Sequence, residues 1–305
     1  MPTFSKSKNG VQLDLSGIVP PMVTPFTPDT EDIDFDLLAQ EATFLASQGV
    51  HSICTTGSTG EGHGLTADEI HDISKTVAQA VGSDVTIVGG IIADTTRETI
   101  DKGLAAKRAG ASALQITPPH YLWAPDADGL VQHFQRVGDA VELPLLIYNV
   151  VPWVDIDVQV MSRIVDEAPW VLGVKQSGGD MHKVADMLAA LRGRVPITTG
   201  IDDLLYPTFA LGVDGAVSCL TAVFPALTKQ LFDAVQAGDH ATAKQIHDRL
   251  LPVWRTIEGN TMTAKAKYAI GLLGRNVGVS RGPILPPSEA QKAEIRSALE
   301  TAEFI

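Results

Sequence analysis

Short hydrophobic runs recur along the chain, and each is followed by a stretch in which apolar residues return every three or four positions. The runs are rich in Val, Ile and Leu and do not alternate with polar residues, which is typical of parallel strands covered on both faces. Because run and periodic stretch alternate eight times, the pattern predicts an α/β fold, a (β/α)8 TIM barrel. The expected strands are residues 17–26, 52–56, 86–92, 113–117, 144–150, 171–177, 196–200 and 215–219.

The stretches between the runs are amphipathic and predict helices. Two of them begin with the spacing of a capping box, Thr66 with Glu69 and Thr95 with Glu98, and others end on glycine. Helices are expected at residues 34–49, 68–81, 97–110, 128–141, 224–237, 240–257, 262–273 and 288–303.

The chain continues beyond the helix that would complete such a barrel. We expect residues 1–235 to form the barrel and carry the active site, and residues 236–305 to form a C-terminal helical extension packed on it. No linker separates the two parts as independent domains. A doubly wound open sheet is the competing architecture, but no GxGxxG motif follows the first run.

Composition and charge narrow the classes of partner. Hydrophobic residues make up 45% of the 305 positions and charged residues 19%, as in ordinary globular proteins. The net charge of -13 and the absence of a Lys and Arg cluster argue against nucleic acid and anionic membranes as partners. The sequence has no apolar stretch of signal-peptide or membrane-spanning length, so we expect a cytoplasmic protein.

The two cysteines, Cys54 and Cys219, lie within apolar runs and have no CxxC spacing. This pattern favours free thiols packed as small hydrophobic residues in a reducing compartment.

Lys175 is the strongest candidate for a catalytic residue. It interrupts the apolar run "VLGVKQS", although lysine is among the residues least often buried. Desolvation favours a neutral amine, which attacks a carbonyl to form a Schiff base. In the alternative interpretation its ammonium leaves the strand end and pairs with a carboxylate such as that of Asp180.

Catalytic groups of such barrels come from the carboxyl ends of the strands and the loops that follow them. Tyr148 ends the strand before that of Lys175, so we expect the two side by side, where a phenol can relay a proton. The alternative is a core tyrosine with a satisfied hydroxyl. The polar residues at these positions are Thr24, Ser58, Thr59, Glu61, Thr117, His120, Tyr121, Tyr148, Asn149, Lys175, Gln176, Ser177, Asp202, Asp203 and Ser218.

The stretch "TTGSTGEGHG" at residues 55–64 follows the second run. Backbone amides freed by Gly57 and Gly60, together with the hydroxyls of Ser58 and Thr59, would form a concavity suited to a carboxylate. A plain turn with a helix cap is the alternative. A phosphate-binding P-loop is excluded, because no Gly-Lys-Ser/Thr follows.

A catalytic metal is a weaker hypothesis. His63, His120, Glu61 and Asp202 fall on the presumed active face, but no pair has the spacing of a dedicated site such as HExxH. We therefore expect no metal and no cofactor.

Three stretches in register resemble the dihydrodipicolinate synthase and N-acetylneuraminate lyase family of class I pyruvate aldolases. They are "GSTGE" at 57–61, "YNVVP" at 148–152 and "GVKQSGGD" at 173–180, and the likeness extends from about residue 17 to about residue 295. The resemblance implies keto-acid and aldehyde substrates and an assembly that is at least a dimer and commonly a dimer of dimers.

The resemblance also implies roles for individual residues. Lys175 corresponds to the lysine that condenses with the C2 carbonyl of a 2-keto acid, Tyr148 to the proton-relaying tyrosine and Ser58 to the hydroxyl linking the relay. Thr59 matches the residue holding the keto-acid carboxylate, in the loop with Gly57. Tyr121 looks like the tyrosine that inserts into a neighbouring subunit's site. The backbones of Gly200 and Val217 match positions lining the pocket, and Asp203 matches an acidic residue that touches substrate hydroxyls.

One departure bears on the substrate. Dihydrodipicolinate synthases usually carry an arginine shortly after the tyrosine, but this chain has no arginine between Tyr148 and Arg163. Trp153 in the same stretch makes the mouth of the expected site more apolar. The leading hypothesis is therefore a Schiff-base lyase that cleaves, condenses or dehydrates pyruvate-derived or 2-keto-3-deoxy acids. The alternatives are 4-hydroxy-tetrahydrodipicolinate synthesis from pyruvate and aspartate semialdehyde, a metal-dependent aldolase, and a non-catalytic keto-acid-binding protein.

Overall fold

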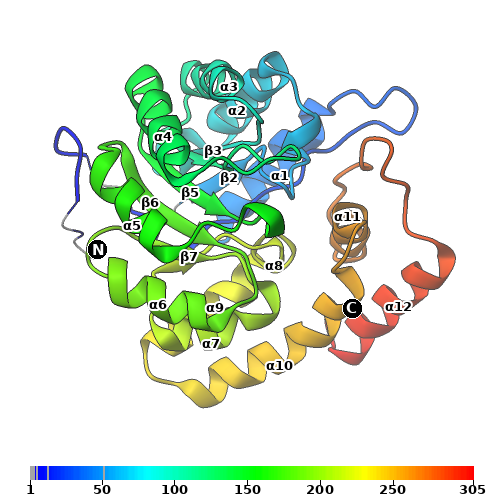
Figure 1. Ribbon diagram of the computed structural model, residues 1–305. Helices are drawn as coiled ribbons and strands as arrows, with labels where there is room; N and C mark the ends of the chain where they lie inside the picture. The colour runs from blue at the N-terminus through cyan, green and yellow to red at the C-terminus, as the bar shows by residue number, and fades with distance from the viewer. Residues whose placement is uncertain (1–3, 5, 12–13, 51) are drawn as a thin grey trace.

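The computed structural model describes residues 4, 6–11, 14–50 and 52–305. In this part of the chain, parallel strands form one eight-stranded sheet in the order β1-β8-β7-β6-β5-β4-β3-β2, and helices surround it (Figure 1). The strands are β1 (Gly17–Ile18), β2 (Ser52–Thr55), β3 (Thr86–Ile91), β4 (Ala113–Ile116), β5 (Leu145–Asn149), β6 (Val171–Gln176), β7 (Ile197–Thr199) and β8 (Gly215–Ala216).

The sheet closes between the segment after β1 and β2. The backbone N–H of Cys54 donates to Pro20 O at 2.9 Å, and the N–H of Met22 donates to Cys54 O at 3.0 Å. Pro21 and Cys54 form an isolated parallel bridge. These bonds complete the cylinder, so the predicted (β/α)8 barrel is confirmed.

Every strand is shorter than predicted, and two predictions were too long by more than two residues. The first run was expected to be a strand over residues 17–26, but Pro20 and Pro21 lack the N–H that a continuous ladder needs. The last was expected over 215–219, but its strand ends at Ala216 and Cys219 begins a helix.

The predicted helices are present, with ends shifted by one or two residues. The Thr66 and Glu69 capping box is complete, while at Thr95 the structure gives only the bond from the Glu98 N–H to the threonine hydroxyl. The helices are α1 (Phe35–Ser47), α2 (Ala67–Val81), α3 (Thr96–Arg108), α4 (Ala127–Val141), α5 (Val158–Glu167), α6 (Met181–Leu191), α7 (Leu205–Leu211), α8 (Cys219–Val223), α9 (Pro225–Gln236), α10 (His240–Ile257), α11 (Met262–Leu272) and α12 (Glu289–Thr301).

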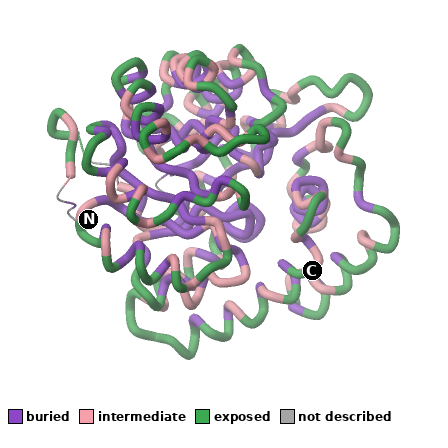
Figure 2. The backbone as a smooth tube through the Cα atoms, viewed as in Figure 1, coloured by how far each residue is buried: buried purple, intermediate pink, exposed green. Residues whose placement is uncertain are grey.

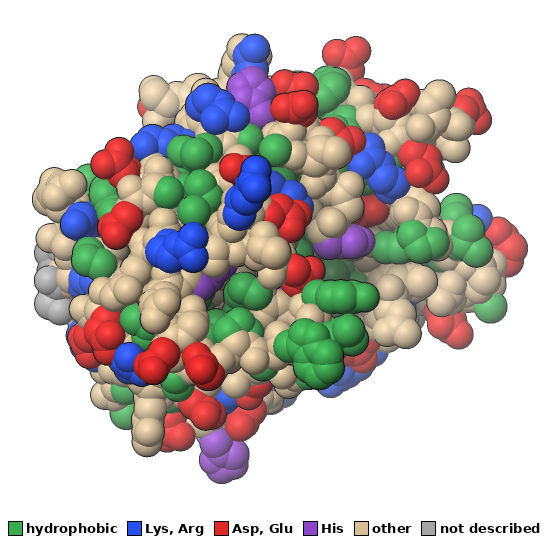
Figure 3. All heavy atoms as spheres, turned by 45° about the horizontal axis from the view of Figure 1, so that its top comes forward, with side chains coloured by type: hydrophobic (Ala, Val, Ile, Leu, Met, Phe, Trp, Pro, Cys, Tyr) green, Lys and Arg blue, Asp and Glu red, His purple; other side chains and the backbone are tan. Residues whose placement is uncertain are grey.

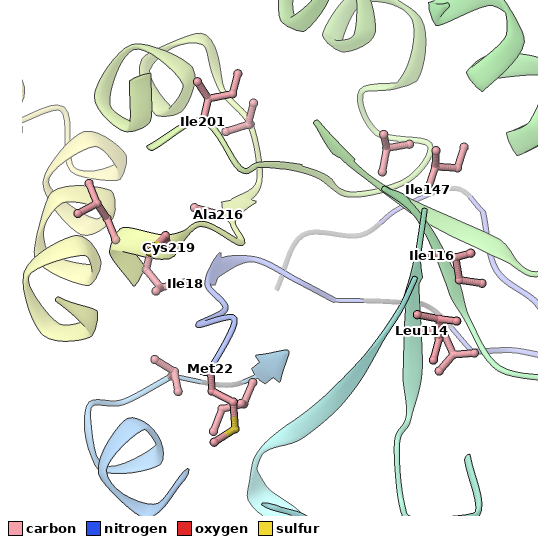
Figure 4. Close-up of a cluster of buried hydrophobic side chains, with 14 of the residues drawn as sticks. Ile18, Met22, Leu114, Ile116, Ile147, Ile201, Ala216 and Cys219 are labelled. Atoms are coloured by element: carbon pink, nitrogen blue, oxygen red, sulfur yellow. The ribbon is translucent and has the colours of Figure 1, made fainter. Parts of the chain in front are cut away.

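The core has two layers. The larger lies between the strands and the surrounding helices; Figure 4 shows some of its side chains, including Ile116 and Ile147. The exposed residues lie mainly on the outer faces of the helices (Figure 2). A smaller cluster fills the barrel interior, which is therefore packed rather than a pore. Its members are Leu15, Val19, Cys54, Val88, Ala113, Leu146, Leu172 and Val217.

Helices α10 to α12 lie to one side of the barrel (Figure 1). Helix α10 packs against α9 and α12, and α11 packs against α8 and α12. The boundary at residues 235 and 236 stays a prediction; α9 ends at Gln236 and α10 begins at His240. Among the described residues, every helix is too short or too polar to cross a bilayer.

Buried His133 of α4 should make the stability of the fold depend on pH. It is buried, its Nδ1 lies 3.0 Å from Thr96 Oγ1, and burial lowers its pKa to about 4, aided by the charge of Arg136. An unfolded histidine titrates near 6.5. As pH falls below about 6.5, the unfolded chain binds a proton that the folded chain binds only near pH 4. The stability that neutral His133 contributes is therefore complete above pH 6.5 and is lost as pH falls below it.

We expect His133 to lower the free energy of unfolding by about 2 kcal/mol when pH is lowered from about 7.5 to about 5. Urea unfolding of the wild-type chain and of His133→Gln at both pH values measures it, since the other titrating groups are shared. An equal pH-dependent loss in the two proteins would contradict the prediction.

Candidate active site

Lys175 and Tyr148 lie side by side at the carboxyl end of the barrel. They are direct partners in the β5 and β6 ladder, and the Lys175 side chain is nearly covered, at 4% exposure. Its Nζ lies 3.8 Å from the centroid of the Tyr148 ring. The alternative pairing with Asp180 is wrong, because that carboxylate caps α6 by accepting from the His182 N–H at 2.8 Å. The lysine therefore faces the phenol.

Ser58 connects the second-strand loop to this pair. Its Oγ lies 3.3 Å from the Tyr148 hydroxyl. Thr59 and Gly57 are buried in the same loop. The amine, the phenol and the serine hydroxyl thus form one continuous row.

The loop is held in a conformation that few residues adopt. Thr56 and Glu61 have positive φ values of 51° and 58°, which is costly for a residue with a side chain. A Cβ on Gly90 of β3 would lie 2.6 Å from the Cα of Gly57, so only glycine lets the loop pack this closely. The residues around Ser58 are therefore packed closely against β3.

Gly200 gives the lysine its room. A Cβ at this position would lie 2.7 Å from Lys175 Cε and 3.1 Å from Val217 O, and would collide with Ser177 Oγ. Val217 itself packs in the barrel interior. Gly200 therefore lies against the lysine side chain, and the Val217 carbonyl lies beside Gly200.

We expect Gly200→Ala to push the Lys175 stem aside. Overpacking should cost about 1–3 kcal/mol of unfolding free energy, and a displaced amine should cost about a hundredfold in turnover. Gly179→Ala is the control, because a Cβ there meets nothing within 4 Å. Equal turnover in the two variants would contradict the prediction.

The two aspartates after β7 have different positions. Asp203, the predicted hydroxyl-binding residue, forms an ion pair with Arg255 of α10 at 2.9 Å. Asp202 is the buried one, and its Oδ1 accepts from the Leu220 N–H at 2.6 Å. Burial raises the pKa of Asp202 to about 6, against the opposing effects of the Leu220 N–H and the nearby charge of Lys175. Asp202 is thus the acidic side chain whose charge interacts with the lysine. It was expected at this end of the barrel, but Asp203 was predicted to be the substrate-binding residue.

Asn149 and Gln176, two of the polar residues expected at the strand ends, bind each other there. The Asn149 Nδ2 donates to Asp155 Oδ1 and Gln176 Oε1, each at 2.8 Å, and its Oδ1 accepts from the Ile156 N–H at 2.9 Å. The amide groups hold the loop after Tyr148 against β6.

Tyr121 lies apart from the lysine, on the surface. It is 72% exposed and its backbone N–H donates to Asp94 Oδ1 at 2.8 Å. Leu122, with a φ of 61°, and Trp123 follow it, and Trp153, 64% exposed, donates from Nε1 to His120 O at 2.7 Å. On the face drawn in Figure 3, hydrophobic side chains gather beside a hollow. Tyr121, Trp123 and Trp153 are exposed aromatic residues of the kind that marks interaction surfaces.

The candidates for a metal do not come together. Glu61 pairs with Lys267, and the Asp202 carboxylate accepts from the Leu220 N–H. His63 is exposed, and His120 Nδ1 lies 3.0 Å from Pro118 O. No group of three or more His, Cys, Asp or Glu among the described residues could hold a metal ion.

Both cysteines are free and buried. Cys54 packs in the barrel interior and Cys219 in the outer layer, as small hydrophobic residues do. Burial raises the pKa of the Cys54 thiol to about 11, so it is not a nucleophile at neutral pH.

A (β/α)8 barrel with a covered lysine and a tyrosine at the carboxyl ends of adjacent strands defines a barrel lyase. The particular group follows from comparison: the chain belongs to the dihydrodipicolinate synthetase family, whose model matches residues 14–302. The predicted family is thereby confirmed, over a slightly longer stretch than expected.

Similar proteins cover nearly the whole chain. A 4-hydroxy-tetrahydrodipicolinate synthase from Sorangium cellulosum is 33% identical over 294 residues, which are 96% of this chain and 97% of the relative. One from Symbiobacterium thermophilum is 31% identical and covers 99% of both chains. Among solved structures, a prophage protein of the family from E. coli K12, in complex with pyruvate, has a TM-score of 0.90 at 29% identity, covering 95% of this chain and 99% of that one.

Proposed function

We propose that this protein is a class I lyase in which Lys175 forms a Schiff base with a 2-keto acid. The observation that carries the proposal is the row of three groups, with Lys175 Nζ 3.8 Å from the Tyr148 ring and the Tyr148 hydroxyl 3.3 Å from Ser58 Oγ. The pyruvate in the complex of the E. coli relative supports a keto acid as the first substrate.

The chemistry follows from these positions. The Lys175 amine attacks the C2 carbonyl to give a carbinolamine, and the Tyr148 phenol delivers the proton that lets hydroxide leave as water, with Ser58 linking the relay. The Tyr148 phenolate then accepts the proton of the C4 hydroxyl of a longer keto acid as the C3–C4 bond breaks, and the iminium accepts the released electron pair, which leaves an enamine and an aldehyde. The Tyr148 phenol returns this proton to the enamine carbon, and water hydrolyses the resulting iminium to release pyruvate and restore the amine.

Thr59 and the amides beside Gly57 hold the keto-acid carboxylate in this proposal, and the backbones of Gly200 and Val217 line the pocket. Asp203 was expected to touch substrate hydroxyls; its pairing with Arg255 leaves the buried Asp202 better placed to interact with groups near the lysine.

The second substrate is proposed to lack a carboxylate in the position that aspartate semialdehyde would need. The loop after Tyr148 contains Trp153 and no arginine, so a bidentate partner for such a group is missing from it. The names of the curated relatives favour the synthase alternative. A panel of 2-keto-3-deoxy acids and aldehydes, assayed for pyruvate release or consumption, decides between them.

We expect turnover of 2-keto-3-deoxy acids or of uncharged aldehydes with pyruvate, and little with aspartate semialdehyde. Activity confined to aspartate semialdehyde would establish the synthase instead. If a chelator abolishes turnover while borohydride treatment leaves it unchanged, the metal-dependent aldolase would be favoured. Keto-acid binding without any turnover would favour the binding protein.

We also propose a cytoplasmic homo-oligomer, a dimer of dimers, in which Tyr121 reaches a neighbouring subunit's site. The exposed Tyr121 and the apolar residues next to it support this assembly. Light scattering after size exclusion should give a dimer or tetramer, and Tyr121→Ser should weaken it and lower turnover. Leu285→Ser, at another exposed apolar position, should do neither. A fully active monomer would contradict the assembly.

A further inference from the structure

Residues of the C-terminal extension bind the loop that carries Ser58 and Thr59. Lys267 of α11 and Glu61 form an ion pair with Nζ and Oε1 2.6 Å apart, and the two side chains are 2% and 3% exposed. The other oxygen of the carboxylate, Oε2, accepts from the backbone N–H of Arg281 at 3.0 Å. Both oxygens of Glu61 are therefore held by residues of the extension.

Lys267 also binds the loop after β1. Its ammonium donates to Thr24 O and to Val279 O, each at 2.6 Å. The Thr24 hydroxyl in turn donates to Gly60 O at 2.7 Å. With these bonds Lys267 has a partner for each of its three donors, and it joins three segments that are far apart in the sequence.

Arg281 fixes the chain immediately after the loop. Its NH2 donates to Glu69 Oε1 at 2.8 Å, and its guanidinium lies 4.3 Å from the centre of the Phe26 ring. Glu69 is the capping-box residue of α2. The start of α2 and the loop before it are thus held by the same part of the extension.

The position of Glu61 gives these contacts a consequence for the site. Glu61 has a φ of 58°, and its N–H donates to Ser58 O at 3.1 Å. A residue kept in this region needs surrounding contacts that hold it there. Because Glu61 lies three residues after Ser58 and two after Thr59, we expect a relaxation at Glu61 to displace both hydroxyls.

We propose that Lys267 and Glu61 are positioning residues for the keto-acid site: the extension, through this ion pair, holds residues 57–61 in the conformation that presents Ser58 to Tyr148 and the loop amides to the carboxylate. The inference deepens the proposed function and rests on it. Neither residue is proposed to touch the substrate.

The chain provides a matched control in a second buried ion pair. Arg275 follows α11 and pairs with Glu41 of α1 at 2.7 Å, with side-chain exposures of 10% and 2%. Like Lys267, it also donates to backbone carbonyls, those of Ala222 and Val223. Removing either cation leaves a carboxylate buried without its partner, but only Lys267 contacts the 57–61 loop.

The test compares Lys267→Met with Arg275→Met in the full-length protein. Wild-type chain is first labelled at Lys175 with pyruvate and borohydride over a range of pyruvate concentrations. We expect Lys267→Met to raise the pyruvate concentration for half-maximal labelling by about tenfold, and Arg275→Met to leave it within about twofold. Hydrogen exchange at the amides of Glu61 and Gly62, which are bonded within the loop, should accelerate in Lys267→Met alone.

Glu61→Gln and Glu41→Gln repeat the comparison with a smaller change, should a methionine variant not fold. The positioning role is overturned if Lys267→Met and Arg275→Met, or Glu61→Gln and Glu41→Gln, change the pyruvate dependence of labelling equally. It is also overturned if neither variant changes it and the loop amides exchange at the wild-type rate. A wild-type chain that pyruvate never labels would refute the proposed function separately, while hydrogen exchange would still decide whether the ion pair holds the loop.

Discussion

Replacing Lys175 with methionine should abolish the proposed chemistry. The variant keeps the length of the side chain but has no nucleophile, so turnover should fall by more than about a thousandfold. The folded state should lose little stability, since the Lys175 side chain lies against the Tyr148 ring and forms no direct ion pair among the described residues. Steady-state assays and urea unfolding measure the two effects.

Lys102→Met is the matched control for this variant. Lys102 is likewise buried, but on α3, where its Nζ donates to Ile92 O at 3.1 Å and pairs with Glu98. Its loss should lower stability and leave turnover nearly intact. Retention of more than about a tenth of the activity by Lys175→Met would contradict the assigned role.

Replacing Tyr148 with phenylalanine should have the next largest effect. The ring on which Lys175 lies is retained, and only the hydroxyl that faces Ser58 is lost. Removing a proton relay typically costs about 10²–10⁴ in rate. We therefore expect a loss of this size in turnover, with the lysine still able to form the adduct more slowly.

The control for Tyr148 is Tyr206→Phe, which removes a phenol on α7 that lies 3.4 Å from His240 Nδ1, outside the site. Rapid-mixing measurement of adduct formation separates the relay step from later steps. Unchanged rates in Tyr148→Phe would show that another group moves the proton.

Much of the fold was predictable because parallel strands buried on both faces produce continuous apolar runs. The register of β5 and β6, which brings Tyr148 beside Lys175, followed from placing both residues at strand ends. The first strand was predicted to continue through Pro20 and Pro21, whereas β1 ends at Ile18 and the barrel closes through the bonds between Cys54 and the residues on either side of Pro21.

The site was predictable only where a residue type was unexpected in its surroundings. A lysine in an apolar strand signalled Lys175, whereas Asp202 and Asp203 are adjacent acidic residues that only the turn after β7 distinguishes. Lys267 was missed although it also lies in an apolar helix, in "TAKAKYAI". Its partner Glu61 lies more than two hundred residues earlier, and no local pattern links residues so far apart.

The most direct measurement is mass spectrometry of the protein after incubation with pyruvate and borohydride. The account predicts a stable adduct of one reduced pyruvate per chain, on the peptide containing Lys175 and absent from Lys175→Met. No adduct, or an adduct on another lysine, would contradict the claim that this amine is the nucleophile of the barrel.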